Sequence, residues 1–258
     1  MNQPIFSVVI DNYNYGRFLG EAIESILAQD FPSRGVEIIP VDDESTDNSR
    51  DIIRSFGDRV KPLFQKNQGQ PACFNNGAAK SKGRYICFLD SDDYWHKDKL
   101  KKVLAFFQKY PSVGLVQHYL LDVNAQKESL NNPLPAWPDT CTLEDFLKAN
   151  IPYAATSGLT LTREVASKVL PIPKQHFCFT DNYISTRALF SAPMGNIREV
   201  LGYHRVHGNN FWAAKLSSPA LIEGELKERE FFSCELLSWL KEAGKELSPR
   251  YLEMENLE

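Results

Sequence analysis

The sequence lacks a long apolar run, a basic leader segment and a paired cysteine motif. No hydrophobic stretch approaches the roughly 20 residues that a membrane-spanning helix needs, and no basic residues precede the first strand-like segment. We therefore expect a cytoplasmic protein, with peripheral association at the inner face of the membrane left open. The five cysteines are scattered and form no CxxC pair, so we expect reduced thiols rather than a zinc or redox site.

A basic block is also missing, which bears on the kind of partner. The chain carries 29 Lys and Arg against 33 Asp and Glu, for a net charge of −4. Because no stretch could track a phosphate backbone, the charge pattern argues against nucleic acid. A small anionic ligand stays open, since it needs only local positive charge, a metal or a helix N-terminus.

The length and composition are those of an ordinary globular enzyme. Hydrophobic residues make up 43% and charged residues 24% of the 258 residues, far from disordered or collagen-like usage. We predict one domain over residues 1–215, with a nucleotide-binding half (1–100) and an acceptor half (101–215). A C-terminal helical extension would follow at 216–258.

Short apolar segments alternate with amphipathic ones through the first hundred residues. Ile5–Ile10 predicts a buried strand, and an apolar stripe from Phe18 to Leu27 predicts a helix that ends before Pro32. The pattern continues with strands at Val36–Val41, Val60–Phe64 and Tyr85–Leu89, and helices at Asp47–Phe56 and Pro71–Lys80. This βαβα order predicts an α/β fold with a Rossmann-like, doubly wound and mostly parallel sheet, helices on both faces, and ligands beyond the strands' carboxyl ends.

The second half shows a looser pattern, and we expect it to carry the acceptor contacts. A Pro-rich loop at Asn131–Trp137 precedes a helix capped by Thr142. Further helices are predicted at Leu100–Tyr110, Tyr183–Phe190 and Leu221–Leu240, and strands at Val113–His118, Gly158–Thr162 and Ile197–Val206.

Carboxylates follow two of the predicted strands. Asp90 and Asp92, after Tyr85–Leu89, lie two residues apart, so in extended chain both project to the same side, and their oxygens suit Mg²⁺ or Mn²⁺. The alternative is that Ser91 or Asp92 only caps the next helix. A second acidic run, Asp42–Asp47, also follows a buried strand and opens a helix. Both runs should therefore meet at one edge of a parallel sheet.

The ordered motifs in this region resemble those of family 2 glycosyltransferases. They are Ser7-Val-Val-Ile, Tyr13-Asn14, Val41-Asp-Asp-Glu-Ser-Thr-Asp47, Gly69-Gln70 and Phe88-Leu-Asp-Ser-Asp-Asp93. The resemblance covers residues 5 to 100 and implies the single-domain GT-A fold. It also implies transfer of a sugar from a nucleoside diphosphate with inversion at the anomeric carbon.

Carried over by position, the resemblance implies roles for the first-half residues. Asp43 would read the nucleotide base, with Asp11 and Tyr13 bordering the base pocket. Asp90 and Ser91 would lie near the ribose or the cation, and Asp92 would ligate Mn²⁺ or Mg²⁺. A carboxylate can accept the N3–H of uracil, which favours a UDP-sugar, and a cation on the diphosphate stabilises the charge on the departing group.

Weaker signals in the second half suggest a base and a diphosphate contact. Asp181 resembles the family's acidic residue that opens a helix near the acceptor, so we predict that it is the general base rather than a helix cap, with Asp139 as the alternative. His207 matches the late Tyr-Arg-x-His segment and would approach the metal, with Arg205 on the diphosphate. Phe211-Trp212 would either close over the donor or pin the C-terminal helix.

Three departures from the family pattern leave the base preference open. Asp11-Asn12 stands where Pro-Thr is usual, Glu44 where a glycine is usual, and Phe74 where an arginine often precedes Asn75. Two other functions therefore stay in competition: a sugar-nucleotidyltransferase, and a noncatalytic nucleotide-sugar-binding protein. We expect a carbohydrate or lipid-linked acceptor and a role in polysaccharide biosynthesis. The sequence indicates neither the sugar nor the oligomeric state.

Overall fold

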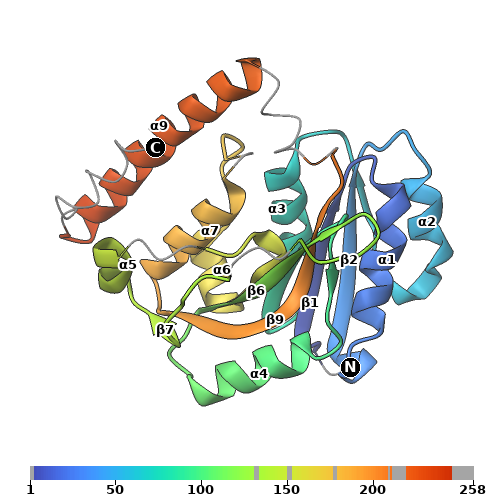
Figure 1. Ribbon diagram of the computed structural model, residues 1–258, viewed down its shortest axis with the longest axis horizontal. Coiled ribbons are helices and arrows are strands. Elements are labelled where there is room, and N and C mark those ends of the chain that lie inside the picture. The colour runs from blue at the N-terminus through green and yellow to red at the C-terminus, as the bar shows by residue number, and fades with distance from the viewer. Residues whose placement is uncertain are drawn as a thin grey trace.

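A computed structural model shows one curled sheet with helices on both faces (Figure 1). It describes residues 3–130, 134–149, 153–176, 179–208, 210 and 219–245. Within that part of the chain, no helix is both long and apolar enough to cross a membrane.

The first half of the chain forms the parallel part of the sheet, in the order β3-β2-β1-β4. These strands are β1 (Phe6–Asn12), β2 (Val36–Asp43), β3 (Leu63–Gln65) and β4 (Tyr85–Asp90), joined by α1 (Gly16–Leu27), α2 (Ser49–Ser55) and α3 (Gln70–Lys80). The register sets Asp11 beside Asp90 and Asn12 beside Asp42, so the two acidic strand ends do meet at one edge. The predicted βαβα architecture is confirmed.

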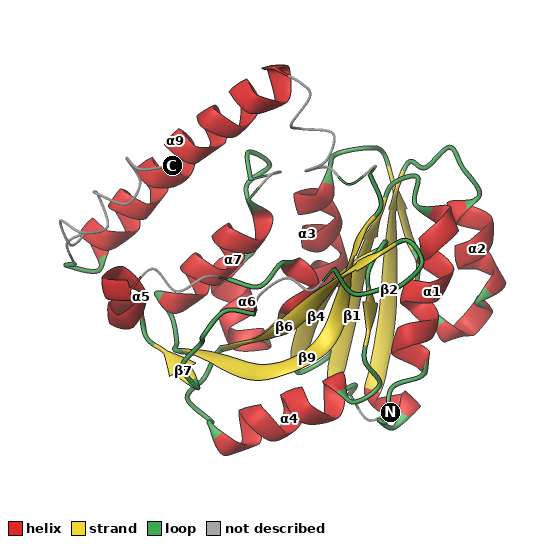
Figure 2. Cartoon of the chain, viewed as in Figure 1, coloured by secondary structure: helices red, strands yellow, loops and turns green. Residues whose placement is uncertain are grey.

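The second half extends the same sheet in mixed directions. Its strands are β5 (Tyr94–Trp95), β6 (Leu115–Asn124), β7 (Thr140–Cys141), β8 (Leu159–Thr162) and β9 (Met194–Val206). β8 lies between β4 and β6 and runs against both, whereas β6 and β9 are parallel; β5 and β7 pair antiparallel with β9 (Figure 2). The long β9 thereby returns to the edge where β4 ends, through its pairing with β5.

The helices of the second half match the predicted ones, with one addition. They are α4 (Lys99–Lys109), α5 (Leu143–Ala149), α6 (Arg163–Val169), α7 (Thr180–Leu189) and α9 (Pro219–Glu242). The pattern analysis missed α6, which starts where Thr162 accepts the Val165 N–H as a helix cap. β3 was predicted to start at Val60, but it starts at Leu63 because a short 3₁₀ turn at Gly57–Arg59 occupies the chain before it.

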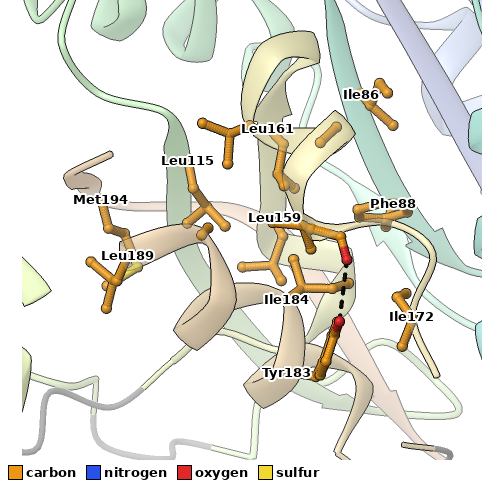
Figure 3. Packing of buried hydrophobic residues seen from close by; sticks show 14 of the residues in the cluster. Ile86, Phe88, Leu115, Leu159, Leu161, Ile172, Tyr183, Ile184, Leu189 and Met194 are labelled. Carbon is orange, nitrogen blue, oxygen red and sulfur yellow. Dashed lines mark hydrogen bonds between the residues drawn. The ribbon is translucent and has the colours of Figure 1, made fainter. Parts of the chain in front are cut away.

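Two hydrophobic cores cover the sheet, because successive side chains of a strand point to opposite faces. Val8 and Ile10 of β1 face the core under α1 and α4, whereas Val9 faces the core under α3, α6 and α7. Figure 3 shows part of the second core, in which Phe88, Leu159 and Ile184 lie in one buried cluster. The strand ends are thus held by packing on both sides.

Gly77 sets how closely α3 approaches β1. A Cβ atom at this position would lie 2.2 Å from Cγ1 of Val9 and 3.1 Å from Cγ2 of Val41. We expect Gly77→Ala to lower the free energy of unfolding by about 1–3 kcal/mol in urea denaturation, because the core cannot take the added methyl group.

Gly20 of α1 provides a matched control, since a Cβ there would meet its nearest atom at 3.7 Å. Gly20→Ala should be neutral or stabilising by up to about 1 kcal/mol, as alanine favours the helix. Equal stability of the two variants would contradict the close approach at Gly77.

Candidate functional site

Asp43, at the end of β2, anchors the loop that leads into α3. Its Oδ1 accepts the N–H of Gln68 at 2.9 Å and Nε2 of Gln65 at 2.8 Å, and its Oδ2 accepts the N–H of Gly69 at 2.7 Å. The side chain is buried. The Gln68 N–H also lies 3.2 Å from Oδ2, so three donors share the roughly four acceptor positions of the carboxylate, and one further donor can be accepted if Gln68 keeps only its shorter bond.

The turn after Asp43 accounts for one departure from the family pattern. Glu44 has a φ of +67°, in the left-handed region that glycine enters without strain. Its carboxylate accepts the N–H of Asn67 at 3.2 Å. Glu44 therefore forms the same turn that a glycine usually forms, although a left-handed backbone is strained for a residue with a side chain. In return, its carboxylate adds a hydrogen bond to the loop before α3.

Asp11 and Asp90 form a partly buried pair at the ends of β1 and β4. Nε2 of Gln70 lies 3.3 Å from Oδ2 of Asp11 and 3.1 Å from Oδ1 of Asp90, so one amide bridges the two carboxyls. The Thr156 hydroxyl lies 2.7 Å from each oxygen of Asp90. Oδ1 of Asp11 is buried without a hydrogen-bond partner among the described residues.

Burial and mutual repulsion disfavour ionisation of this pair. Burial, and then the charge of Asp92, raises the pKa of Asp90 to about 6. The same burial, with the charges of Asp90 and Asp92, holds the pKa of Asp11 well above its usual range. A positive charge brought to this edge would therefore be strongly favoured.

Asp92, two residues after Asp90, has 14% of its side chain exposed. Its Oδ2 lies 3.1 Å from Nε2 of His207 and 3.3 Å from Nδ2 of Asn210. Nη2 of Arg17 lies 3.0 Å from Nδ1 of His207. Because arginine can only donate, Nδ1 accepts, and we assign the proton of a neutral imidazole to Nε2, which donates to Asp92.

The described residues include no group of three or more His, Cys, Asp or Glu side chains arranged to hold a metal ion. Asp92 and His207 nevertheless supply a carboxylate oxygen and an imidazole nitrogen at one point. A cation that takes part of its coordination from substrate phosphates and water needs only one or two protein carboxylates. The donor set therefore fits a cation that arrives with its phosphate ligand.

Arg205 is engaged by the protein itself. Its side chain is 2% exposed, with Nη2 2.7 Å from a Glu21 oxygen and Nε 2.9 Å from the carbonyl oxygen of Asp92. Its own N–H donates to Oδ1 of Asp93 at 2.9 Å. These contacts tie β9 to the turn that carries Asp92, so the geometry gives Arg205 a supporting place rather than a free guanidinium facing a ligand.

The remaining first-half candidates differ in exposure. Ser91 is buried between Asp90 and Asp92, whereas Tyr13, just after β1, is 47% exposed. Tyr13 therefore presents a ring at the edge where the nucleotide is expected. The predicted closing pair, Phe211 and Trp212, lies outside the described residues.

Asp181 lies in the first turn of α7, where Phe179 rather than Asp181 is the N-cap. Its Oδ1 accepts the N–H of Asn182 at 2.9 Å. Burial, with a smaller contribution from the charge of Glu228, raises its pKa to about 6. The charge of Asp181 in turn helps to raise the pKa of Asp90, so the two carboxylates lie within electrostatic reach.

Asp139, the alternative base, lies elsewhere. Its side chain is 51% exposed and pairs with Nη2 of Arg198 at 2.6 Å, and its carbonyl accepts the N–H of Asn196. These partners belong to the part of β9 that pairs with β7. The structure thus brings Asp181, and not Asp139, toward the acidic edge.

Sequence reasoning missed three polar residues at this site. Gln70 belongs to a quoted motif but received no role, and Thr156 comes from a 3₁₀ turn (Thr156–Gly158) that has no sequence signal. Burial opposes a charge on His204, but its hydrogen bond to Asp122 and the charges of Asp93 and Asp92 raise its pKa to about 9. A protonated His204 therefore lies beside the carboxylates. The spacing of residues within one motif could not reveal this contact between distant segments.

Comparisons with known proteins show which family this sequence matches. Residues 7–170 match the model of glycosyl transferase family 2. The chain is 38% identical over 215 residues to an uncharacterized glycosyltransferase of Nostoc sp., covering 79% of this chain and 65% of that protein. It is 34% identical over 111 residues to the poly(ribitol-phosphate) beta-N-acetylglucosaminyltransferase TarS of Staphylococcus aureus, covering 42% of this chain and 19% of TarS. The chain thus spans less than two thirds of these relatives' length.

Solved structures confirm the fold. TarS residues 1–349 in complex with UDP superpose with a TM-score of 0.67 at 23% identity, over 80% of this chain and 62% of that one. A mannosyltransferase of Pyrobaculum calidifontis in complex with GDP-Man and Mn²⁺ gives a TM-score of 0.63 at 17% identity, over 84% and 61%. The predicted GT-A architecture is therefore correct.

The raised pKa of Asp90 implies a stability cost at neutral pH. A carboxyl whose folded pKa exceeds its unfolded value of 3.8 contributes stability below pH 4, and loses it as the pH rises through about 6. We expect Asp90→Asn to raise the free energy of unfolding at pH 7.5, in metal-free buffer, by on the order of 1–3 kcal/mol. At pH 4.5 the gain should largely disappear.

Asp43→Asn is the control, because it leaves an amide NH₂ facing groups that donate to Asp43. It should lower stability at pH 7.5. The free energy of unfolding is measured by urea denaturation at both pH values. Equal effects of Asp90→Asn at the two would refute the claim that ionised Asp90 lowers stability.

Proposed function

The chain belongs to glycosyl transferase family 2, and we propose that it moves a sugar from a nucleoside diphosphate sugar to an acceptor hydroxyl, with inversion at the anomeric carbon. The observation that carries this proposal is that Asp90 and Asp92 lie at and just after the carboxyl end of β4, with Asp181 of α7 within electrostatic reach of Asp90. Open α/β sheets bind their ligands at this edge. Family membership favours transfer over the nucleotidyltransferase and noncatalytic alternatives.

The nucleotide would lie over the ends of β1 and β2. We assign the base to Asp43, with Asp11 and Tyr13 beside it, and the ribose to Asp90 and Ser91. The fold neighbours are bound to UDP, UDP-GlcNAc and GDP-Man. We favour a UDP-sugar, because the remaining acceptor capacity of Asp43 suits the N3–H of uracil, and because TarS, which matches part of the chain, is named as an N-acetylglucosaminyltransferase.

Asp92 and His207 would hold Mn²⁺ or Mg²⁺ on the diphosphate. Such a cation, when bound, neutralises the charge that develops on the departing diphosphate. Nε2 of His207 carries a proton in the described hydrogen-bond arrangement, so ligation through Nε2 requires that proton to leave and the Arg17 contact to change. Asp92 needs no such change and is the principal ligand in our assignment. Arg205 would keep the Asp92 turn in place.

Asp181 would serve as the general base. As the acceptor oxygen forms a bond to the anomeric carbon, the bond from that carbon to the diphosphate oxygen breaks, and the hydroxyl proton passes to Asp181. A base with a pKa of about 6 is mostly ionised at neutral pH, yet basic enough to take the proton. The acceptor would be a carbohydrate or lipid-linked glycan of polysaccharide biosynthesis.

A panel of UDP- and GDP-sugars tests the reaction type. The protein is incubated with each sugar nucleotide and Mn²⁺, and released nucleoside diphosphate is measured with and without candidate acceptors. Release from one sugar nucleotide supports transfer. Formation of sugar 1-phosphate on addition of pyrophosphate would indicate a nucleotidyltransferase, and binding without turnover would indicate a noncatalytic protein.

Asp92→Asn should remove the Mn²⁺-dependent part of nucleoside diphosphate binding, because an amide is a weaker ligand than a carboxylate for a hard cation. Calorimetry with and without Mn²⁺ measures this difference. Asp58→Asn, on the exposed Gly57–Arg59 turn, is the control and should bind as the wild type does. Unchanged Mn²⁺ dependence in Asp92→Asn would remove Asp92 from the cation site.

Asp181→Asn should bind the donor normally but lower kcat by roughly 10²-fold or more, since only the proton acceptor is lost. Because the base must be ionised, the wild-type rate should rise with pH through about 6, and the variant should lack this rise. Asp139→Asn should keep both the rate and the pH profile. Near-wild-type turnover of Asp181→Asn would place the base elsewhere.

A further inference from the structure

The helix α9 lies beyond the part of the chain that matches the family model, yet it packs against the acceptor side of the domain. Leu236 and Leu240 are buried in the core shared with α7. The ring of Trp239 lies 5.6 Å from that of Tyr183 and 5.8 Å from that of Phe190. Figure 2 shows α9 running alongside α7. This helix is thus joined to the element that carries Asp181.

Polar groups of α9 reach the segment just before α7. The imidazole of His176 is fully buried, with Nε2 2.5 Å from Oε2 of Glu235 and Nδ1 3.8 Å from Oε1 of Glu228. The rings of Phe231 and Tyr183 pack against the same imidazole. Two glutamates that lie two turns apart on α9 therefore enclose the imidazole of His176.

Glu228 also binds the backbone at the N-cap residue of α7. Its Oε1 accepts the N–H of Phe179 at 2.8 Å, in a buried environment. The Thr180 hydroxyl donates to the carbonyl of His176 at 2.6 Å, and the Tyr183 N–H donates to the carbonyl of Phe179. Two hydrogen bonds therefore hold the residues just before Asp181: Glu228 binds the Phe179 N–H, and the His176 carbonyl binds the Thr180 hydroxyl.

We propose that Glu228 of α9 is a positioning residue for Asp181, so that the C-terminal helix forms part of the catalytic unit. This inference rests on the proposed role of Asp181 as the base. A helix N-terminus leaves its first N–H groups without intrahelical partners, and the Phe179 N–H finds its acceptor in Glu228 rather than in a local cap. Loss of that acceptor removes the buried hydrogen bond that ties the Phe179 backbone to α9, and so loosens the turn that carries Asp181.

The charge of Glu228 also affects the pKa of Asp181. It contributes, after burial, to the raised pKa of the Asp181 carboxyl. Glu228 is thus close enough to influence the proton affinity of the base, although it belongs to a helix some fifty positions away in the sequence. A displacement of the base of about 1 Å is enough to cost roughly 10²-fold in rate.

Three variants test the proposal. Glu228→Ala removes the acceptor, Glu228→Gln keeps an oxygen for the Phe179 N–H, and Glu223→Gln alters an exposed acid of the same helix that pairs with Lys227. For each, kcat and KM are measured with the sugar nucleotide from which the wild type releases nucleotide in Mn²⁺. Hydrogen exchange at the Phe179 amide provides a readout that does not depend on activity.

We expect Glu228→Ala to lower kcat by about 10- to 100-fold with KM for the donor unchanged, and to speed exchange at Phe179. Glu228→Gln should recover most of the rate, and Glu223→Gln should match the wild type. Wild-type kcat in Glu228→Ala, or an equal loss of rate in Glu228→Gln with normal Phe179 exchange, would overturn the positioning role. A rise in KM alone would do so as well.

The same experiment separates this inference from the function itself. No nucleotide release by the wild type from any UDP- or GDP-sugar would contradict the proposed reaction. Fast exchange at Phe179 in Glu228→Ala would still show that Glu228 orders the turn. Normal turnover in the wild type with normal exchange in Glu228→Ala would instead refute the inference alone.

Discussion

The repulsion among carboxylates at the ends of β1 and β4 is the constraint around which the rest of the site is arranged. Asp11 and Asp90 are neighbours by strand register, and Asp92 and Asp93 follow within one turn. Burial makes each charge costly, so the surrounding groups mostly donate: Gln70 and Thr156 to the pair, and the backbone of Arg205 to Asp93. These donors offset only part of the repulsion, so added positive charge at this edge would stabilise the ionised carboxylates.

The second half of the sheet completes this edge from a distance in the sequence. β8 runs against β4, and the 3₁₀ turn that precedes it carries Thr156 to the Asp90 carboxyl. β9 pairs with β5 and brings His204 and His207 to the same place. The start of β8 and the end of β9 therefore both lie at the carboxyl ends of the parallel strands, because β8 runs against β4, whereas β6 and β9 run in the same direction as β4.

The start of α7 is likewise held by contacts with α9, which is distant from it in the sequence. The buried imidazole of His176, between Glu228 and Glu235, links a loop to a helix that follows it by some fifty residues. Aromatic packing of Trp239 on Tyr183 adds an apolar contact to this polar one. The end of β4 and the start of α7 are therefore held by different contacts, and the charge of Asp181 helps to raise the pKa of Asp90.

The sequence by itself determined the alternation of strands and helices, the acidic strand ends and the family, because apolar periodicity and short motifs are local properties. It also identified Asp92 and His207, which the structure brings into contact. Only the tertiary structure decided that the Arg205 guanidinium is occupied by Glu21 and that Gln70 bridges two carboxyls, since these pairings join segments far apart in the chain. It likewise decided between Asp181 and Asp139 in location, because burial and proximity to Asp90 depend on how α7 packs, and no local pattern records that packing.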